Sequence, residues 1–163
     1  LDLGCGNGEN ENIFYKMGAK KVILTDFYSK KAHLLSDVHN LPFKDESFDF
    51  IMCNHVLEHV ENDIKALKEI KRVLKKRGKG IVQVPFYHPI PENTIEDKSI
   101  TSKFDRERLY GQDDHVRKYG KDYKNRLELV GFRVELVNPN HILSKDEIKR
   151  YSVIENEDIF CIH

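Results

Sequence analysis

The sequence contains few cysteines, and the three that it has, Cys5, Cys53 and Cys161, stand apart from one another. None forms a C-x-x-C pair, which is the usual signature of a zinc or redox-active dithiol site. Each lies at or near a predicted strand. We therefore expect buried free thiols in a protein of the reducing cytoplasm.

Net charge and long apolar runs are also absent. Lysine plus arginine number 27, and aspartate plus glutamate also number 27. Because there is no overall basic field, a nucleic-acid partner is disfavoured. No apolar run approaches the roughly 20 residues that span a bilayer, so no membrane association is expected. The oligomeric state does not follow from the sequence.

Length and composition limit the architecture. A chain of 163 residues with 39% hydrophobic content can form one sizeable core but not two ordinary domains. Residues 1–163 are therefore expected to form a single domain. The chain has no initiator methionine, and Leu1 enters the first predicted strand near its end. We expect that strand to be incomplete here and to be completed by upstream residues.

Apolar strands alternate with helical patterns along most of the chain, which predicts a doubly wound α/β fold with a mostly parallel sheet. Predicted strands cover residues 21–25, 47–53, 80–85, 132–137 and 158–162. Predicted helices cover residues 9–17, 29–35, 61–76, 121–130 and 145–151. The pattern breaks down over residues 86–120, and loops of this length are usually functional or disordered.

The most informative motif is the run Leu-Asp-Leu-Gly-Cys-Gly-Asn-Gly-Glu over residues 1–9. An apolar strand end that leads into Gly-x-Gly-x-Gly brings the backbone close to a bound ligand. A dinucleotide site has the pattern Gly-x-Gly-x-x-Gly, and Glu9 or Glu11 stands here where its third glycine belongs. A carboxylate at that point would repel a pyrophosphate. The loop therefore favours a ligand that contains adenosine but no phosphates.

This run resembles the cofactor loop of class I S-adenosylmethionine-dependent methyltransferases, whose form is hydrophobic-Asp-hydrophobic-Gly-x-Gly-x-Gly. Residues 37–43 and residues 48–60 resemble later segments of the same family, in the same order. The resemblance implies a Rossmann-like fold with a mostly parallel seven-stranded sheet and an antiparallel last strand. It also implies S-adenosyl-L-methionine as the cofactor, with loop contacts from Asp2, Gly4, Cys5, Gly6 and Gly8.

Other cofactor contacts are assigned by position. Asp26 lies ~20 residues beyond the loop, where an acid can accept both ribose hydroxyls, although NAD enzymes use the same arrangement and a plain capping role is the alternative. The resemblance implies that the Asp37 carboxylate takes the adenine amino group and that the Val38 N–H meets the ring nitrogen. Phe27 or Leu41 would lie against the ring. A structural alternative for Asp37 is the capping of a turn.

The strand that ends near Cys53 is followed by Asn54-His55-Val56-Leu57-Glu58-His59. In the family, the residue after this strand touches the methionine moiety, which makes Asn54 and His55 candidates for that contact. The same run matches the H-x-x-E-H pattern of inverted zinc peptidases. It lies at a strand-to-helix junction, however, and no distant third ligand is evident in the sequence. The sequence therefore predicts no metal.

Methyl transfer from a sulfonium is an in-line displacement in which the enzyme mainly holds donor and acceptor close and dry. A histidine can take the proton of a hydroxyl acceptor, and His55, His88 and His115 are the candidates near the ligand-binding edge of the sheet. Residues 86–120 are expected to cover a polar small-molecule acceptor, with contacts from Tyr87, His115 and Arg117. The alternative is an internal network of ion pairs and caps that includes His115 and Arg117.

The leading hypothesis is an S-adenosylmethionine-dependent methyltransferase that acts on oxygen or nitrogen of a small polar acceptor. A second hypothesis is a non-catalytic methyltransferase-like module with a binding or regulatory role. A third, an NAD-dependent oxidoreductase, is weakened by the missing third glycine.

Overall fold

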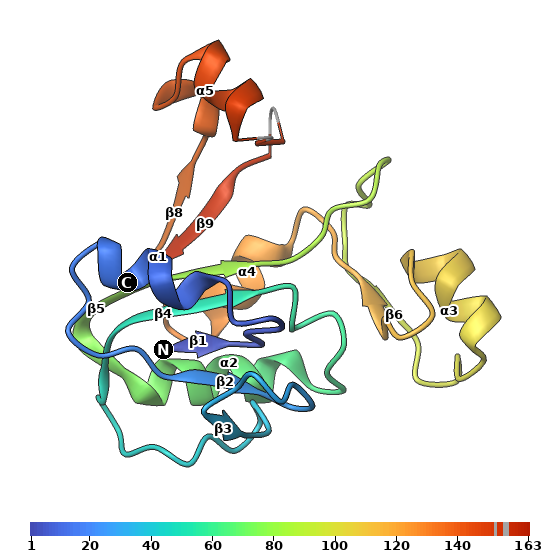
Figure 1. The fold of residues 1–163 in the computed structure, drawn as a ribbon. Helices are drawn as coiled ribbons and strands as arrows, with labels where there is room; N and C mark the ends of the chain where they lie inside the picture. The colour runs from blue at the N-terminus through green and yellow to red at the C-terminus, as the bar shows by residue number, and fades with distance from the viewer. Residues whose placement is uncertain (152, 155–156) are drawn as a thin grey trace.

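The computed structural model describes residues 1–151, 153–154 and 157–163. Within these residues, seven strands form one sheet in the order β3-β2-β1-β4-β5-β9-β8 (Figure 1). A separate two-stranded sheet pairs β6 with β7. The strands are β1 (Asp2–Leu3), β2 (Leu24–Asp26), β3 (Leu34–Leu35), β4 (Phe48–Asn54), β5 (Leu74–Gln83), β6 (Ile95–Glu96), β7 (Arg117–Lys118), β8 (Val134–Val137) and β9 (Ile159–Ile162).

The large sheet is parallel except at one edge. β1 pairs in parallel with β2 and β4, β2 pairs in parallel with β3, and β4 pairs in parallel with β5. β9 is antiparallel to both of its neighbours, β5 and β8. The predicted Rossmann-like sheet with an antiparallel last strand is therefore confirmed.

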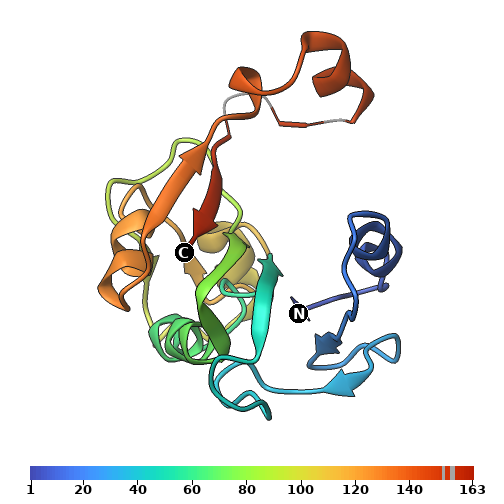
Figure 2. The ribbon, with the colours of Figure 1, turned by 90° about the vertical axis from the view of Figure 1, so that its left-hand side faces the viewer.

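Helices lie on both faces of this sheet, as Figures 1 and 2 show. α1 packs on one face, where Phe14 contacts a small cluster formed by Cys5, Val22 and Leu24. α2 and α4 lie on the other face and contribute Leu67, Ile70, Tyr123 and other side chains to the main core. The helices are α1 (Asn10–Lys16), α2 (Asp63–Val73), α3 (Lys103–Tyr110), α4 (Tyr123–Leu129), α5 (Lys145–Arg150) and the 3-10 turn η1 (Pro139–His141).

The amphipathic pattern before Gly78 produces α2, as predicted, but the helix is shorter than residues 61–76. Asn62 begins it, because the side-chain oxygen accepts a hydrogen bond from the Lys65 N–H at 2.9 Å. The helix ends at Val73, and β5 begins directly at Leu74. β5 is therefore longer than the predicted strand.

The helix predicted over residues 29–35 is wrong. The Asp26 carboxylate accepts the N–H groups of Tyr28 and Ser29, and the Ser29 hydroxyl donates to the Gly6 carbonyl. These contacts hold a turn against the glycine loop in place of a helical turn. The chain then continues as the short edge strand β3, where Leu34 and Leu35 are exposed.

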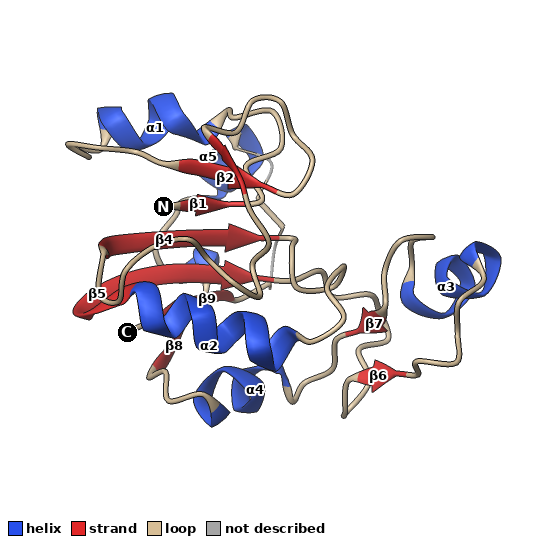
Figure 3. Cartoon of the chain, turned by 90° about the horizontal axis from the view of Figure 1, so that it is seen from below, coloured by secondary structure: helices blue, strands red, loops and turns tan. Residues whose placement is uncertain are grey.

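Residues 86–120 are more regular than the sequence pattern indicates. They contain β6, α3 and β7, which lie beyond the carboxyl ends of β4 and β5 (Figure 3). Ser102 caps α3 by accepting the Asp105 N–H, and Gly111 ends it with a φ of 99°. The β8–β9 hairpin lies at the edge of the sheet that is opposite to β3, and it carries α5 (Figures 1 and 2). None of the described helices is long and apolar enough to span a bilayer.

Candidate functional site

The predicted cofactor residues come together at the carboxyl edge of the parallel strands. The glycine loop follows β1, Asp26 ends β2, and Asn54 ends β4. Figure 3 shows β1, β2, β4 and β5 running in the same direction toward this edge. In open α/β sheets, this is the edge where ligands bind, between strands whose connections run to opposite faces.

The glycine loop uses a backbone conformation that side chains rarely adopt. Gly4, Gly6 and Gly8 have φ values of 69°, 51° and 73°. A Cβ at Gly4 would collide with the Val56 side chain, whereas a Cβ at Gly6 would meet no atom within 4 Å. The backbone at Gly6 therefore faces open space. Glycine there allows a ligand to approach the main chain closely.

Asp26 joins the glycine loop to β2. Its Oδ2 accepts the Gly6 N–H at 3.0 Å, and its Oδ1 accepts the Tyr28 and Ser29 N–H groups at 2.8 and 2.9 Å. Burial raises the pKa of Asp26, but these backbone donors outweigh burial and lower it overall. Asp26 is therefore an ionised, fixed carboxylate beside the loop.

Asp2 lies under the loop and is 2% exposed. Asn10, at the start of α1, donates to its Oδ2 at 3.3 Å. Burial raises the pKa of Asp2. Cys5 is also buried, and burial raises its thiol pKa, so this cysteine is an apolar contact of the loop and not a nucleophile.

The predicted adenine contacts lie along the loop after β3. The Asp37 Oδ1 atom accepts the His39 N–H at 2.8 Å and lies 2.7 Å from His39 Nδ1, so this carboxylate also caps a turn. Its side chain remains half exposed. Val38 is buried in the core, and the Phe27 ring, 57% exposed, packs edge-on against Tyr28. An exposed aromatic ring beside Asp26 is suited to stacking on a base.

Asn54 and His55 follow β4. The Asn54 Oδ1 atom is buried and has no hydrogen-bond partner among the described residues, and buried polar atoms without partners are rare. His55 has a φ of 54°, an uncommon value for a residue with a side chain. Such outliers concentrate at functional sites.

Glu58 is the site residue that the sequence analysis did not assign. It lies in the turn between β4 and α2, its side chain is 1% exposed, and its Oε1 is 3.4 Å from His55 Nδ1. This contact is the main reason that the pKa of His55 is raised. The H-x-x-E-H match placed Glu58 near His55 in the sequence, but only the folded turn shows that its carboxylate contacts the His55 ring.

His115 and Arg117 line neither of the two cavities described below, and both side chains are buried. Their predicted substrate contacts, and the role of His115 as a base, stay predictions. His115 is 1% exposed, and its Nδ1 lies 3.2 Å from the Tyr110 carbonyl oxygen. Burial lowers its pKa. Arg117 is 2% exposed.

The Arg117 guanidinium closes the turn that follows β4. Nη1 donates to the carbonyls of Leu57 and Val60, and Nη2 donates to the carbonyl of Glu61 at 3.0 Å. Nε donates to the Glu96 carboxylate at 3.0 Å. The structure supports the internal network of ion pairs and caps that was the alternative for this segment.

Tyr87 and His88 follow β5 but face different surroundings. The Tyr87 ring packs over Gly111 and its hydroxyl accepts a hydrogen bond from Gln112 Nε2 at 3.4 Å, so it attaches the α3 segment. His88 is exposed and lines a cavity of about 410 Å³. The other residues that line this cavity are Phe86, Ile90, Lys121, Ile154, Glu157, Asp158 and Phe160.

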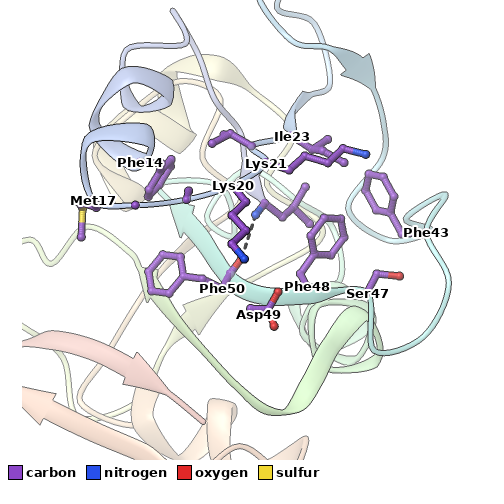
Figure 4. A pocket seen from close by; sticks show the side chains of 14 residues that line it. Phe14, Met17, Lys20, Lys21, Ile23, Phe43, Ser47, Phe48, Asp49 and Phe50 are labelled. Atoms are coloured by element: carbon purple, nitrogen blue, oxygen red, sulfur yellow. Dashed lines mark hydrogen bonds between the residues drawn. The ribbon is translucent and has the colours of Figure 1, made fainter.

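A larger cavity, of about 780 Å³, lies beside the amino ends of β2 and β4 (Figure 4). Its walls come from α1, from residues 18–23 before β2, and from the start of β4 at Phe48, Asp49 and Phe50. Leu1 also lines it, and the Leu1 backbone nitrogen donates to the Phe50 carbonyl at 2.9 Å. Glycine loop residues, Asp26 and Asn54 do not line it. Size alone therefore does not identify the cofactor site.

The residues at the carboxyl edge fit an adenosine ligand with a cationic amino acid portion. Gly6 offers open backbone, Asp26 offers an ionised carboxylate, and Asn54 Oδ1 offers an acceptor without a partner among the described residues. An ammonium group or ribose hydroxyls can donate to such acceptors. The carboxylates here do not suit a pyrophosphate.

Comparisons with known proteins agree with this geometry. Residues 1–82 match the family described as "Methyltransferase domain". An uncharacterized protein of Methanocaldococcus jannaschii is 42% identical over 89 residues, which are 52% of this chain and 39% of that protein. A tRNA U34 carboxymethyltransferase of Campylobacter hominis is 33% identical over 100 residues, which are 52% of this chain and 35% of the relative.

Among solved structures, a Burkholderia thailandensis 1,6-didemethyltoxoflavin-N1-methyltransferase has the same fold. It contains bound 1,6-didemethyltoxoflavin and S-adenosylhomocysteine. The TM-score is 0.63 at 15% identity, and the match covers 99% of this chain and 68% of that one. The matched segments span only 39% and 35% of the length of the two curated relatives named above. The family match covers half of the chain, so the chain belongs to the methyltransferase domain family, whose cofactor is S-adenosylmethionine.

Proposed function

We propose that this chain transfers the methyl group of S-adenosylmethionine to an oxygen or nitrogen atom of a small polar acceptor. The observation that carries the proposal is the position of His55. It directly follows β4 at the carboxyl edge, has a φ of 54°, and contacts a glutamate that is 1% exposed. A strained, exposed histidine supported by a buried carboxylate is typical of a group that acts on a substrate.

The Glu58 contact fixes which nitrogen of His55 acts as the base. Nδ1 lies 3.4 Å from the carboxylate, which only accepts, so Nδ1 carries the proton. Nε2 then has a lone pair, and the imidazole side chain is 57% exposed. His55 Nε2 is therefore the atom that takes the proton of the acceptor, and Glu58 is its positioning residue.

Asp26, Gly6 and Asn54 hold the cofactor in this scheme. Asp26 accepts the ribose hydroxyls, Gly6 leaves room for the ligand against the backbone, and Asn54 Oδ1 accepts from the ammonium group. When bound, the cofactor would supply an activated methyl group, and its sulfonium sulfur would keep the bonding electron pair as the acceptor atom forms the new bond. The protein holds the two reactants close and in line.

In this proposal the acceptor binds in the cavity beside β5 and β9, which His88 lines. Phe86 and Phe160 stack there with centroids 5.7 Å apart, and Lys121, Glu157 and Asp158 add charge. This mixture of an apolar floor with a few charged groups is typical of small-molecule sites. The balanced charge of the chain, with 27 basic and 27 acidic residues, disfavours a long polyanion.

The test is formation of S-adenosylhomocysteine from S-adenosylmethionine over a panel of small hydroxyl and amine acceptors. The parent chain is compared with His55→Gln, which has a similar size but no basic nitrogen, and with His141→Gln, whose exposed histidine lies in η1. Loss of kcat by about 100-fold or more in His55→Gln alone, with unchanged cofactor affinity, supports the proposal.

Two outcomes would overturn parts of it. Tight cofactor binding with no turnover on any acceptor favours the non-catalytic module. Methylation of a tRNA substrate, but of no small molecule, contradicts the acceptor class while keeping the transferase activity.

A further inference from the structure

Two histidines and a glutamate from distant parts of the chain meet beside the turn that follows β4. They are Glu58, His59 and His115, and one potential ligand atom from each lies within 4.8 Å of the other two. The His59 and His115 rings meet edge-on with centroids 4.7 Å apart. The Val116 N–H donates to the Glu58 carbonyl at 2.9 Å, so the backbone keeps His115 beside the turn.

The neighbours of Nδ1 in His59 and His115 determine which ring nitrogen is free to bind a metal. His59 Nδ1 lies 3.2 Å from the Asp114 carboxylate, and His115 Nδ1 lies 3.2 Å from the Tyr110 carbonyl oxygen. Both neighbours only accept hydrogen bonds, so each Nδ1 carries a proton and each Nε2 has a lone pair. Metal-bound histidines are oriented in this way, by a carboxylate or carbonyl on the nitrogen that does not bind the metal.

The burial of the Glu58 carboxylate is separate evidence for a bound cation. Its side chain is 1% exposed, and its Oε2 atom is buried without a hydrogen-bond partner among the described residues. Its Oε1 atom lies 3.8 Å from His59 Nε2. A buried carboxylate oxygen and two imidazole lone pairs are all electron-rich, and a cation placed among them removes their mutual repulsion.

We propose that Glu58, His59 and His115 form a binding site for a divalent transition-metal ion, with zinc as the representative ion. Two imidazole nitrogens and one carboxylate oxygen are a ligand set that zinc accepts. Three protein ligands leave at least one coordination position for water or another small ligand. The metal joins the β4–α2 turn to the segment that carries α3, next to His55.

The structure supplies the distant ligand that the H-x-x-E-H motif lacks in the sequence. His115 is 56 positions beyond His59 in the numbering, and chain folding brings it to the turn. The first histidine of the motif, His55, contacts Glu58 and is not part of the cluster. The site therefore differs from a helical zinc-peptidase motif, and it reverses the expectation that the chain holds no metal.

The test is calorimetric titration of the metal-free chain with zinc chloride, without cofactor or acceptor, so that its outcome is independent of the methyltransferase proposal. The proposal predicts one zinc ion per chain and an affinity that falls at least tenfold in His59→Ala and in His115→Ala. His141→Ala is the matched control, and its affinity should equal that of the parent chain.

His115 is buried, so His115→Ala can fail to fold, whereas the His59 side chain is 35% exposed and His59→Ala should fold. Cobalt absorption gives a second readout, since histidine and carboxylate ligation in a distorted tetrahedron produces visible bands that His59→Ala should remove. No zinc binding at micromolar concentrations overturns the proposal, as does equal zinc affinity in the parent and His59→Ala proteins.

Discussion

The Asp63 carboxylate receives a paired hydrogen bond from Arg126, with Nε donating to Oδ2 and Nη2 donating to Oδ1, both at 2.8 Å. The pair joins the first turn of α2 to α4, which are far apart in the sequence. Tyr119 adds a hydroxyl donor to Oδ2 at 3.0 Å. Planar, two-point pairs of this kind are the strong ion pairs of proteins.

Replacement of Asp63 by asparagine should destabilise the fold by about 3 kcal/mol, because it leaves the largely buried Arg126 guanidinium without its main partner. Urea unfolding at neutral pH measures this change. Asp49→Asn is the control, since Asp49 is exposed and its ion-pair partner, Lys75, also lies at the surface. Equal loss of stability in both variants would contradict the assigned role of the Asp63 pair.

The same pair predicts that the unfolding free energy decreases at acidic pH. Burial raises the pKa of Asp63, but Arg126, Arg117 and Tyr119 outweigh burial and lower it overall. A carboxylate with a lowered folded pKa stabilises the protein above its unfolded pKa of about 4 and loses that contribution as the pH falls through the folded value. Unfolding free energy measured between pH 6 and about 2 should fall less steeply in Asp63→Asn than in the parent chain. Parallel curves would contradict this.

Substitution of Arg117 distinguishes a structural role from its predicted contact with the acceptor. Arg117→Met keeps the length of the side chain but removes all four hydrogen bonds of the guanidinium. Three of the acceptors are carbonyls of the turn after β4, so stability should fall by about 3 kcal/mol or more, with a lower Tm. Arg108→Met should stay close to the parent, because Arg108 is 63% exposed. A variant that keeps the parent Tm but loses turnover would support the substrate role.

Alanine substitutions at two glycines distinguish backbone strain, which lowers stability, from steric exclusion of the ligand, which lowers affinity. Gly6 and Gly131 have φ values of 51° and 91°, and a Cβ at either would meet no atom within 4 Å. Alanine at each position should cost about 1–2 kcal/mol of stability. Only Gly6→Ala should also weaken S-adenosylhomocysteine binding, by at least tenfold, because the added methyl occupies ligand space. Similar affinity in the two variants would show that the ligand does not approach Gly6.

Local patterns predicted the elements whose contacts are local. The apolar spacing of Leu67, Ile70 and Val73 predicted α2, and the glycine loop predicted the edge where the site lies. The helix expected over residues 29–35 did not form because Asp26 and Ser29 make hydrogen bonds to Gly6 in the glycine loop. The free energy that helix propensity contributes over these residues is smaller than the contribution of these tertiary hydrogen bonds.

The site could be predicted only in part. Asp26, Asn54 and His55 lie where strand ends and motif spacing placed them. The burial of Arg117 could not be predicted, because its acceptors are backbone carbonyls about 60 residues earlier in the chain. Capping signals at Ser102 and Gly111 could have identified α3, although its charged sequence gave no amphipathic pattern.

If the carboxyl edge holds S-adenosylmethionine through Asp26, calorimetric titration with S-adenosylhomocysteine should show one ligand per chain. The affinity should fall about tenfold to a hundredfold in Asp26→Ala, as expected for lost hydrogen bonds to a charged group. Asp45→Ala, which removes an exposed carboxylate before β4, should bind like the parent. No binding to the parent chain, or equal affinity in Asp26→Ala, would show that Asp26 does not hold the cofactor.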